Sequence, residues 1–205
     1  IHRESDYFAV KTAYEGVKGL DGRVALHFVR RGHVGLNPIG AGRATMCLYV
    51  EGACLRRWGG ELDGLMEDLC AQNARLAANL DGAVRTEGWR TCRAVADGVL
   101  RFSENDIYYA GDAVTMVNPI IGGGIPVALE GAALLGRLLA GATDQRNDPK
   151  IAKEYAREWK HRFLRRVLVA SALGKAERSE VITGALFGLL RWQPGFLGRI
   201  VKLSR

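Results

Sequence analysis

Residues 107–131 read IYYAGDAVTMVNPIIGGGIPVALEG, and this stretch decides the fold. A short run of strand-forming residues leads directly into the dipeptide Gly111-Asp112. Three consecutive glycines, Gly122–Gly124, then precede an apolar segment that predicts a helix over residues 125–140. The stretch therefore places a carboxylate after a strand, and a loop without side chains at the start of a helix.

Each part of this stretch has a chemical consequence. Because Gly122–Gly124 carry no side chains, a flat ligand can approach the main chain closely there. The N-terminus of the following helix presents unpaired amide N–H groups and partial positive charge. Asp112 can accept hydrogen bonds from sugar-like hydroxyls. Together these features predict a pocket for a ligand that carries a polyol and an electron-poor ring.

The stretch resembles the second flavin-binding motif of flavoproteins with the p-hydroxybenzoate hydroxylase fold: G-D-A, a short loop, P-x-x-G-x-G, then a helix carrying A-L-x-x-G. Upstream, residues 32–43 (GHVGLNPIGAGR), followed by Cys47-Leu48, resemble the matching strand pair of the geranylgeranyl reductase-like branch. There, a glycine, an aromatic or small residue and a proline line the substrate side of the flavin. The resemblance covers about residues 7–170. It implies an α+β fold, with an antiparallel substrate-domain sheet, helices, and the C-terminal strand and helix of a Rossmann-like FAD-binding domain.

The resemblance also implies roles for individual residues. Asp112 would hydrogen-bond the ribityl chain of FAD, and Pro119 would shape the loop beside the isoalloxazine. The glycine loop and the amide of Ile125 would face N1 and the O2 carbonyl of the ring. Since hydride arrival places charge near N1, N–H donors fixed there stabilise the reduced flavin. The predicted cofactor site comprises Gly111, Asp112, Pro119, Gly122, Gly123, Gly124 and Ile125.

By resemblance, the chain is an FAD-dependent oxidoreductase. It is either a reductase of isoprenoid or lipid double bonds or a monooxygenase that uses NAD(P)H and O₂, and the sequence does not decide between them. The expected substrate is a small hydrophobic or aromatic molecule. His33, which precedes Gly35 and Pro38 in the resembling strand, is the only catalytic candidate. A hydrogen-bonded structural histidine is the favoured interpretation of that residue.

Two motifs of related flavoproteins are missing. No GxGxxG fingerprint, which grips the ADP half of FAD in full members, occurs in these 205 residues. The W-x-W-x-I-P signature of flavin-dependent halogenases is also absent. Because the sequence starts at Ile1 rather than Met, we expect the C-terminal portion of a longer enzyme, inactive alone. The alternative is a non-catalytic fragment of this fold that acts as a membrane-surface or partner-binding module.

Hydrophobic periodicity predicts where the elements lie, and the resemblance implies their roles, so that together they divide the chain into three predicted segments. They are a substrate-side antiparallel sheet with one helix (residues 1–104), the second FAD motif with a buried helix (105–145), and a basic helical region (146–205). Glu130, inside the buried helix, is predicted to pair with an arginine. Strands are predicted at 7–14, 23–30, 43–50 and 107–110, a hairpin at 91–95 and 99–103, and helices at 60–80, 125–140 and 149–173; a last apolar segment spans residues 181–190.

The composition argues against three classes of protein, namely membrane-spanning proteins, zinc proteins and disulfide-stabilised proteins. Arginines interrupt the apolar stretches, so the sequence predicts no membrane-spanning helix. The spacing of Cys47, Cys54, Cys70 and Cys92 fits neither a zinc site nor a disulfide framework. The four cysteines are therefore expected to be small buried side chains in a cytoplasmic protein without a bound metal.

Charge is concentrated at the C-terminal end. Residues 1–149 carry 16 Lys and Arg against 18 Asp and Glu, whereas residues 150–205 carry 13 against 4. No zinc-finger, homeodomain or RNA-recognition pattern accompanies this basic tail, so nucleic acid is not expected as a partner. A helix that docks on its own domain with its basic side chains in solvent is the favoured interpretation. Peripheral contact of the tail with the anionic inner face of a membrane is the alternative.

Overall fold

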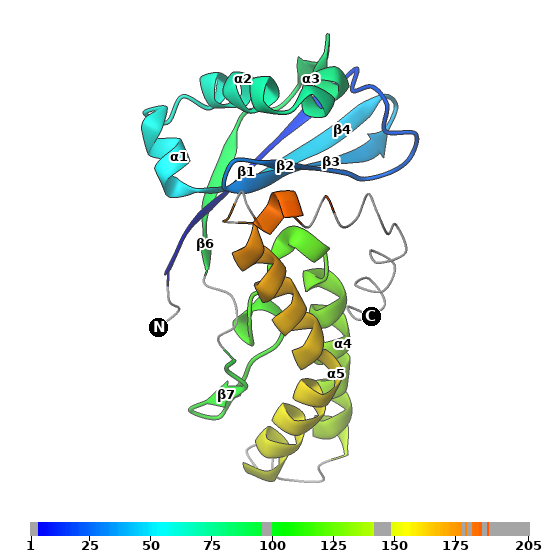
Figure 1. The fold of residues 1–205 in the computed structure, drawn as a ribbon. Coiled ribbons are helices and arrows are strands. Elements are labelled where there is room, and N and C mark those ends of the chain that lie inside the picture. Colours follow the sequence, from blue (N-terminus) through cyan, green and yellow to red (C-terminus); the bar gives the residue numbers. More distant parts are fainter. Residues whose placement is uncertain are drawn as a thin grey trace. The chain divides into compact units, whose positions relative to one another are not determined.

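The computed structural model describes residues 4–95, 100–141, 149–177, 179, 182–185 and 188 (Figure 1). The chain forms two compact units, each with its own hydrophobic core. The first comprises residues 1–95 and 177–183, and the second comprises residues 96–176 and 184–205. Most of the second and third predicted segments thus belong to one unit, and the chain divides after residue 95 rather than after residue 104.

The first unit is built on a six-stranded antiparallel sheet with the order β2-β3-β4-β1-β5, in which β6 also pairs with β1. Its strands are β1 (Glu4–Glu15), β2 (Ala25–Val29), β3 (Gly32–Gly40), β4 (Arg43–Glu51), β5 (Val84–Arg85) and β6 (Arg90–Val95). Three helices, α1 (Gly52–Arg57), α2 (Leu62–Gln72) and α3 (Ala74–Leu80), lie between β4 and β5 in the chain. Figure 1 shows α2 and α3 over one face of this sheet. The predicted antiparallel sheet with helices is confirmed.

Alternation along the strands gives this sheet two different faces. On one face, apolar side chains such as Val34 and Leu48 pack with Leu65 and Leu69 of α2 in a single core. Residues of the opposite parity point to the other face, which we call the second face. His33 and its cross-strand neighbour Tyr49 lie there. The same sheet therefore presents an apolar core to the helices and an aromatic row to its other side.

The structure corrects several predicted elements of the first unit. Residues 32–40 form strand β3, as the resemblance implies, although the alternation pattern alone does not predict it, because they contain glycines and a proline that disfavour strands. The single helix predicted at 60–80 is two helices, because Asn73 interrupts it: its side chain accepts a hydrogen bond from the Leu76 amide (3.0 Å) and donates one to the Phe28 carbonyl (3.0 Å). The predicted hairpin at 91–103 is also wrong, because β6 pairs with β1 and Ser103 pairs with Tyr108.

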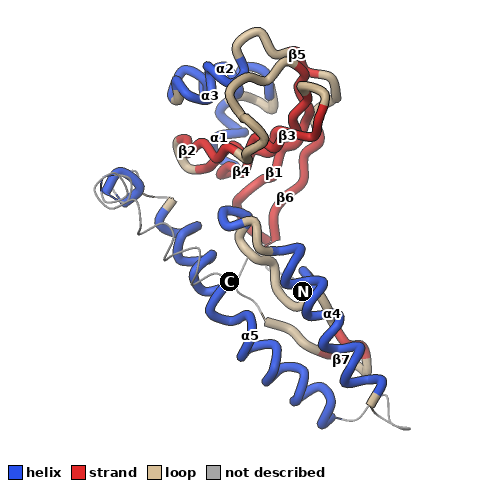
Figure 2. The backbone as a smooth tube through the Cα atoms, turned by 90° about the vertical axis from the view of Figure 1, so that its right-hand side faces the viewer, coloured by secondary structure: helices blue, strands red, loops and turns tan. Residues whose placement is uncertain are grey.

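The second unit is mainly helical. It contains the short hairpin β7 (Ser103–Glu104) and β8 (Ile107–Tyr108), the 3₁₀ turns η1 (Gly111–Ala113) and η2 (Pro119–Ile121), and the helices α4 (Gly124–Ala140) and α5 (Pro149–Ala176). α4 and α5 run beside each other (Figure 2). The row predicted on α5 at spacings of three and four is confirmed as core: Tyr155, Trp159, Phe163, Val167 and Ala170 are all buried. Phe102 packs edge-on against Tyr155 and Trp159, with ring centroids 5.7 and 5.5 Å apart.

Two expectations for α4 are wrong. The helix was expected to be buried on nearly all sides, but Ile125 is 75% exposed and Leu129 is 67% exposed. Glu130 is exposed as well, so it has no burial cost that an arginine would have to offset. Among the described residues, α5 and the preceding loop cover one side of α4 only, where Val127 and Leu134 are buried.

Three further features of the described residues bear on the sequence predictions, namely the cysteines, metal binding and membrane-spanning helices. All four cysteines are free, but none is buried as expected: Cys47 and Cys92 are exposed on the second face of the sheet, and Cys54 and Cys70 are half-buried. Within the described ranges, no three His, Cys, Asp or Glu side chains gather into a metal site. None of the helices in those ranges has an apolar run suited to crossing a membrane. The basic tail beyond residue 188 lies outside the described residues, and so does much of the apolar segment 181–190.

Candidate functional site

The chain leaves β8 through Gly111, and this residue must be a glycine for two reasons. Its φ of 59° lies in the left-handed region, where side chains are strained. A Cβ at this position would also lie 3.1 Å from the Cβ of Ala128 on α4. The amides of Val114 and Thr115 donate back to the Gly111 carbonyl (2.9 and 3.3 Å), which closes η1. Gly111 therefore fixes η1 directly against the second turn of α4.

Asp112 is the residue that this turn presents. Its side chain is exposed, and no other described residue hydrogen-bonds it or forms an ion pair with it. A carboxylate in this state keeps all its acceptor sites for a ligand. The sequence predicts this role from the position of Asp112 after a strand, and the structure adds that the carboxylate belongs to a turn packed on α4.

The entrance to α4 is formed by η2 and the glycine loop. Asn118 caps η2 by accepting a hydrogen bond from the Ile120 amide (3.2 Å), and Pro119 begins that turn. Gly122 ends it with a φ of 62°, its amide donating to the Pro119 carbonyl (2.9 Å). Gly123 is the N-cap of α4 and provides no side-chain hydrogen bond to the helix. The first turn of α4 is therefore left without a side-chain cap.

The space in front of this entrance is open. A Cβ at Gly122 or at Gly124 would meet no atom within 4 Å, and Ile125 is among the most exposed apolar side chains. A Cβ at Gly123 would lie 3.4 Å from Cδ of Arg166 on α5. An uncapped helix N-terminus with free space before it suits the electron-rich edge of a flat ring. The residues present thus fit the pyrimidine edge of a flavin.

The structure places the predicted cofactor residues in one unit and on adjacent elements. Gly111 and Asp112 lie in η1, Pro119 begins η2, and Gly122 to Ile125 form the entrance to α4. η1 contacts α4 through Gly111 and Ala128, and η2 leads into α4 within three residues.

Sequence reasoning missed the residue that supports this loop from behind. A Cβ at Gly174 of α5 would lie only 2.2 Å from Nδ2 of Asn118, which is buried. The dipeptide Asn118-Pro119 is typical of a turn, so the sequence could have predicted the cap that Asn118 forms on η2. No signal in the sequence connects Asn118 with a glycine 56 positions later.

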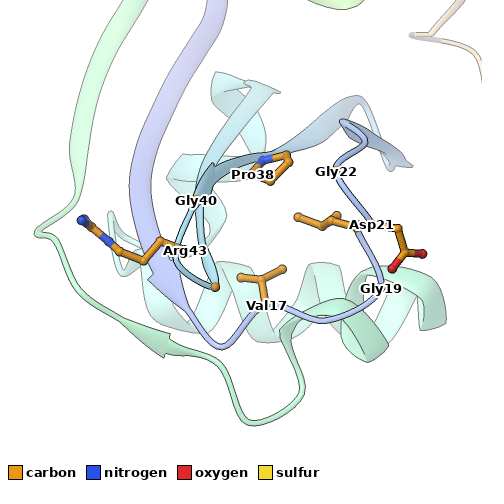
Figure 3. Close-up of a pocket in the computed structure, with 9 residues that line it drawn as sticks. Val17, Gly19, Asp21, Gly22, Pro38, Gly40 and Arg43 are labelled. Carbon is orange, nitrogen blue, oxygen red and sulfur yellow. The ribbon is translucent and has the colours of Figure 1, made fainter.

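A separate pocket of about 240 Å³ lies in the first unit (Figure 3). It is formed by the connection between β1 and β2 and by the turn between β3 and β4, with Val17, Leu20 and Pro38 as its apolar lining. Asp21 and Arg43 contribute its charged groups. None of the predicted cofactor residues lines this pocket.

His33 lies in the first unit, on β3, and is 5% exposed. Its Nδ1 is 2.7 Å from Oε1 of Glu177, a partner that the sequence did not suggest. Its ring lies against Tyr49 and Phe28, with centroid distances of 5.5 and 6.4 Å. The structure therefore gives His33 the buried hydrogen bond that its structural interpretation requires, and leaves its catalytic role a prediction.

Comparison with known proteins gives a family for the chain and a fold for its structure. The family model for squalene epoxidase matches residues 71–176, which is more than half of the chain. No curated protein matches the sequence. The likeness to solved structures extends over most or all of the chain.

Three solved structures illustrate that likeness. The flavin-dependent brominase Bmp2 superposes with a TM-score of 0.79 at 14% identity, over 99% of this chain and 52% of that chain. Klebsiella pneumoniae HpxO, complexed with FAD and uric acid, gives 0.74 at 22% identity, over 100% and 53%. A geranylgeranyl bacteriochlorophyll reductase-like protein from Thermoplasma acidophilum gives 0.68 at 17% identity, over 84% and 43%. The predicted α+β flavoprotein fold is confirmed, and the chain spans about half the length of these structures.

Proposed function

Because the chain belongs to the squalene epoxidase family, we propose that it forms the substrate-side sheet and the second flavin motif of an FAD-dependent oxidoreductase. The proposal rests on one observation above all. An exposed carboxylate, Asp112, which has no partner among the described residues, sits in a turn packed against a helix whose N-terminus has no side-chain cap and faces open space. Such an arrangement offers acceptors for a polyol and amide donors for a ring carbonyl.

Each residue of the site has a distinct task in this proposal. Asp112 holds the ribityl hydroxyls of FAD, and the amides at Gly124 and Ile125 donate toward the pyrimidine edge of the ring. FAD, when bound, supplies the two-electron chemistry. The positive end of α4 stabilises negative charge on that edge, since the donors are fixed before the charge develops. Gly122 and Gly124 keep side chains out of the approach to these amides.

Oxygen insertion is the reaction that family membership favours. An apolar substrate S would be converted to SO according to S + O₂ + NAD(P)H + H⁺ → SO + H₂O + NAD(P)⁺. NAD(P)H is the proposed reductant. Reduction of an isoprenoid double bond, C=C + NAD(P)H + H⁺ → HC–CH + NAD(P)⁺, is the second candidate, because the same fold occurs in a geranylgeranyl reductase-like protein.

The names of two matches support the proposed substrate class. The family model is that of squalene epoxidase, and one solved structure of the same fold is a geranylgeranyl bacteriochlorophyll reductase-like protein. Both names point to molecules of isoprenoid type. A small hydrophobic substrate of this type is therefore proposed.

The test uses the complete natural protein that carries this chain. After purification and incubation with FAD, it is assayed with NAD(P)H, squalene and isotopically labelled O₂. We expect the absorption bands of bound flavin, NAD(P)H oxidation that squalene accelerates, and labelled oxygen in the product. Flavin-dependent hydrogenation of a double bond without label would favour the reductase. A colourless protein that does not retain added FAD would leave only the non-catalytic interpretation.

A further inference from the structure

Arg166 of α5 lies against the glycine loop that precedes α4. A Cβ added to Gly123 would stand 3.4 Å from Cδ of Arg166, whereas a Cβ at Gly122 or Gly124 would meet no atom within 4 Å. The loop therefore has an open side and a side that α5 covers. The arginine side chain is half-buried, and its Nε atom is buried. This contact lies within the second unit, where α4 and α5 run beside each other (Figure 2).

Covalent geometry limits how far the charge of Arg166 can lie from this loop. The guanidinium carbon Cζ is two bonds from Cδ, which is about 2.5 Å. In every rotamer that keeps Cδ in place, Cζ therefore lies within about 6 Å of the point where a Cβ of Gly123 would stand. Gly123 directly precedes Gly124 and Ile125, whose amides are the proposed donors to the pyrimidine edge. A ring bound there would lie on the order of 10 Å from the cation.

The charge of Arg166 has the same sign as the helix end beside it. The N-terminus of α4 carries partial positive charge from its amides, so a nearby cation adds to the positive potential there. The two acids of α5, Glu154 and Glu158, form ion pairs with Arg157 and Arg162, two or more turns before Arg166. Two positive contributions thus act at the entrance to α4. Such an entrance favours negative charge in front of it.

We propose that Arg166 is a positioning residue for the reduced flavin: its stem supports Gly123, and its charge stabilises the negative charge that reduction places on the pyrimidine edge. This inference rests on the proposed function, which places FAD at the entrance to α4. Hydride transfer, FAD + NAD(P)H → FADH⁻ + NAD(P)⁺, converts a neutral ring into an anionic one. A fixed cation nearby interacts more strongly with the anionic ring than with the neutral one. Arg166 therefore raises the reduction potential of the flavin.

Three variants separate the charge of Arg166 from its packing. Arg166→Gln keeps the stem as far as Cδ and an N–H group near the position of Nε, but it removes the charge. Arg166→Lys keeps both the stem and a positive charge. Arg165→Gln is the matched control, because Arg165 is adjacent in α5 and exposed, so the same charge is lost from the same helix.

The experiment measures the reduction potential of the complete protein loaded with FAD, and it needs neither substrate nor turnover. The flavin is reduced stepwise without oxygen beside a reference dye of known potential, and absorption spectra give the reduced fraction of each. At an effective dielectric constant of about 20, unit charges about 10 Å apart change an equilibrium constant on the order of tenfold. We expect Arg166→Gln to lower the ratio of reduced to oxidised flavin about tenfold, which is about 30 mV in the two-electron midpoint potential. Arg166→Lys should keep the wild-type ratio, and so should Arg165→Gln, whose exposed charge is screened by solvent and salt.

The affinity for oxidised FAD separates this inference from the proposed function. Arg166→Gln should bind oxidised FAD with a Kd close to that of wild type, since the oxidised ring carries no negative charge. An unchanged potential, with or without weaker FAD binding, would overturn the inference, because Arg166 would then only shape the loop. An equal fall in potential in Arg166→Lys or Arg165→Gln would overturn it as well. If Arg166→Gln does not fold, Arg166→Met, which keeps an unbranched stem, decides by the same criteria. A wild-type protein that does not bind FAD refutes the proposed function, and this inference with it.

Discussion

Gly174 of α5 lies so close to Asn118 that a Cβ on the glycine would stand 2.2 Å from the amide nitrogen of the asparagine. Asn118 at the same time caps η2 through the Ile120 amide. The long helix thus supports, from behind, the loop that leads into the candidate flavin site. A contact outside the site therefore controls the shape of its entrance.

Gly174→Ala should disrupt this support. Because Asn118 is buried, its side chain cannot move aside without losing its hydrogen bond to Ile120, and overpacking of this kind costs about 1–3 kcal/mol. The control is Gly136→Ala on α4, where a Cβ meets nothing within 4 Å and alanine should stabilise the helix by about 0.5–1 kcal/mol. Urea unfolding of both variants measures the difference. Equal stabilisation by the two substitutions would contradict the close contact between Gly174 and Asn118.

Gly124→Val tests the open space before α4 without disturbing the fold. A valine side chain there meets no protein atom at its Cβ, so the free energy of unfolding should change by less than about 0.5 kcal/mol. The added methyl groups should obstruct the amides at Gly124 and Ile125, and FAD affinity should fall at least tenfold, about 1.4 kcal/mol. Gly136→Val is the matched control on the same helix, and fluorescence titration with FAD measures both. Full FAD affinity in Gly124→Val would place the ligand elsewhere.

Tyr155 makes the stability of the second unit depend on alkaline pH. Burial raises the pKa of its phenol to about 12, and the hydroxyl has no hydrogen-bond partner among the described residues. In the unfolded chain a tyrosine titrates near pH 10. Since the folded state keeps its proton over a higher range, its stabilising contribution is complete below pH 10 and is lost as the pH rises from about 10 to about 12.

Tyr155→Phe is the variant that reveals this dependence. It should be no less stable than wild type at pH 7, because it removes a buried hydroxyl to which no described residue hydrogen-bonds. Between pH 10 and 11, its free energy of unfolding should decline less steeply than that of wild type, by at most about 1.4 kcal/mol per pH unit. Denaturant titrations at several pH values provide the comparison. Parallel pH profiles for the two proteins would show that Tyr155 does not contribute.

Local patterns predicted much of this structure. The apolar row of α5 follows from spacings of three and four between Tyr155 and Ala170, and the glycine loop before α4 is readable because Gly122 needs a left-handed φ. Three strands of the antiparallel sheet, β1, β2 and β4, follow from alternation. These features depend on neighbours within a few positions, which is the range over which a sequence pattern carries information.

The features that the sequence did not reveal are contacts between distant positions. β6 pairs with β1 rather than with the segment that follows it, and Glu177 reaches His33 across 144 positions. The exposure of Ile125 and Leu129 could not be predicted either. An apolar composition predicts that a helix is buried, but it does not show which other element covers each side of the helix. Tertiary packing decides which distant strands pair and which distant side chains come into contact.

The central claim is that the Asp112 carboxylate and the entrance to α4 hold one FAD. Titration of the complete protein with FAD tests this most directly, using Asp112→Ala beside the control Asp106→Ala, an equally exposed carboxylate in the β7–β8 turn. Loss of charge-assisted hydrogen bonds should raise the Kd of Asp112→Ala at least tenfold, about 1.4 kcal/mol, with unchanged stability. The Kd of Asp106→Ala should remain that of wild type. The same Kd for both variants would contradict the account.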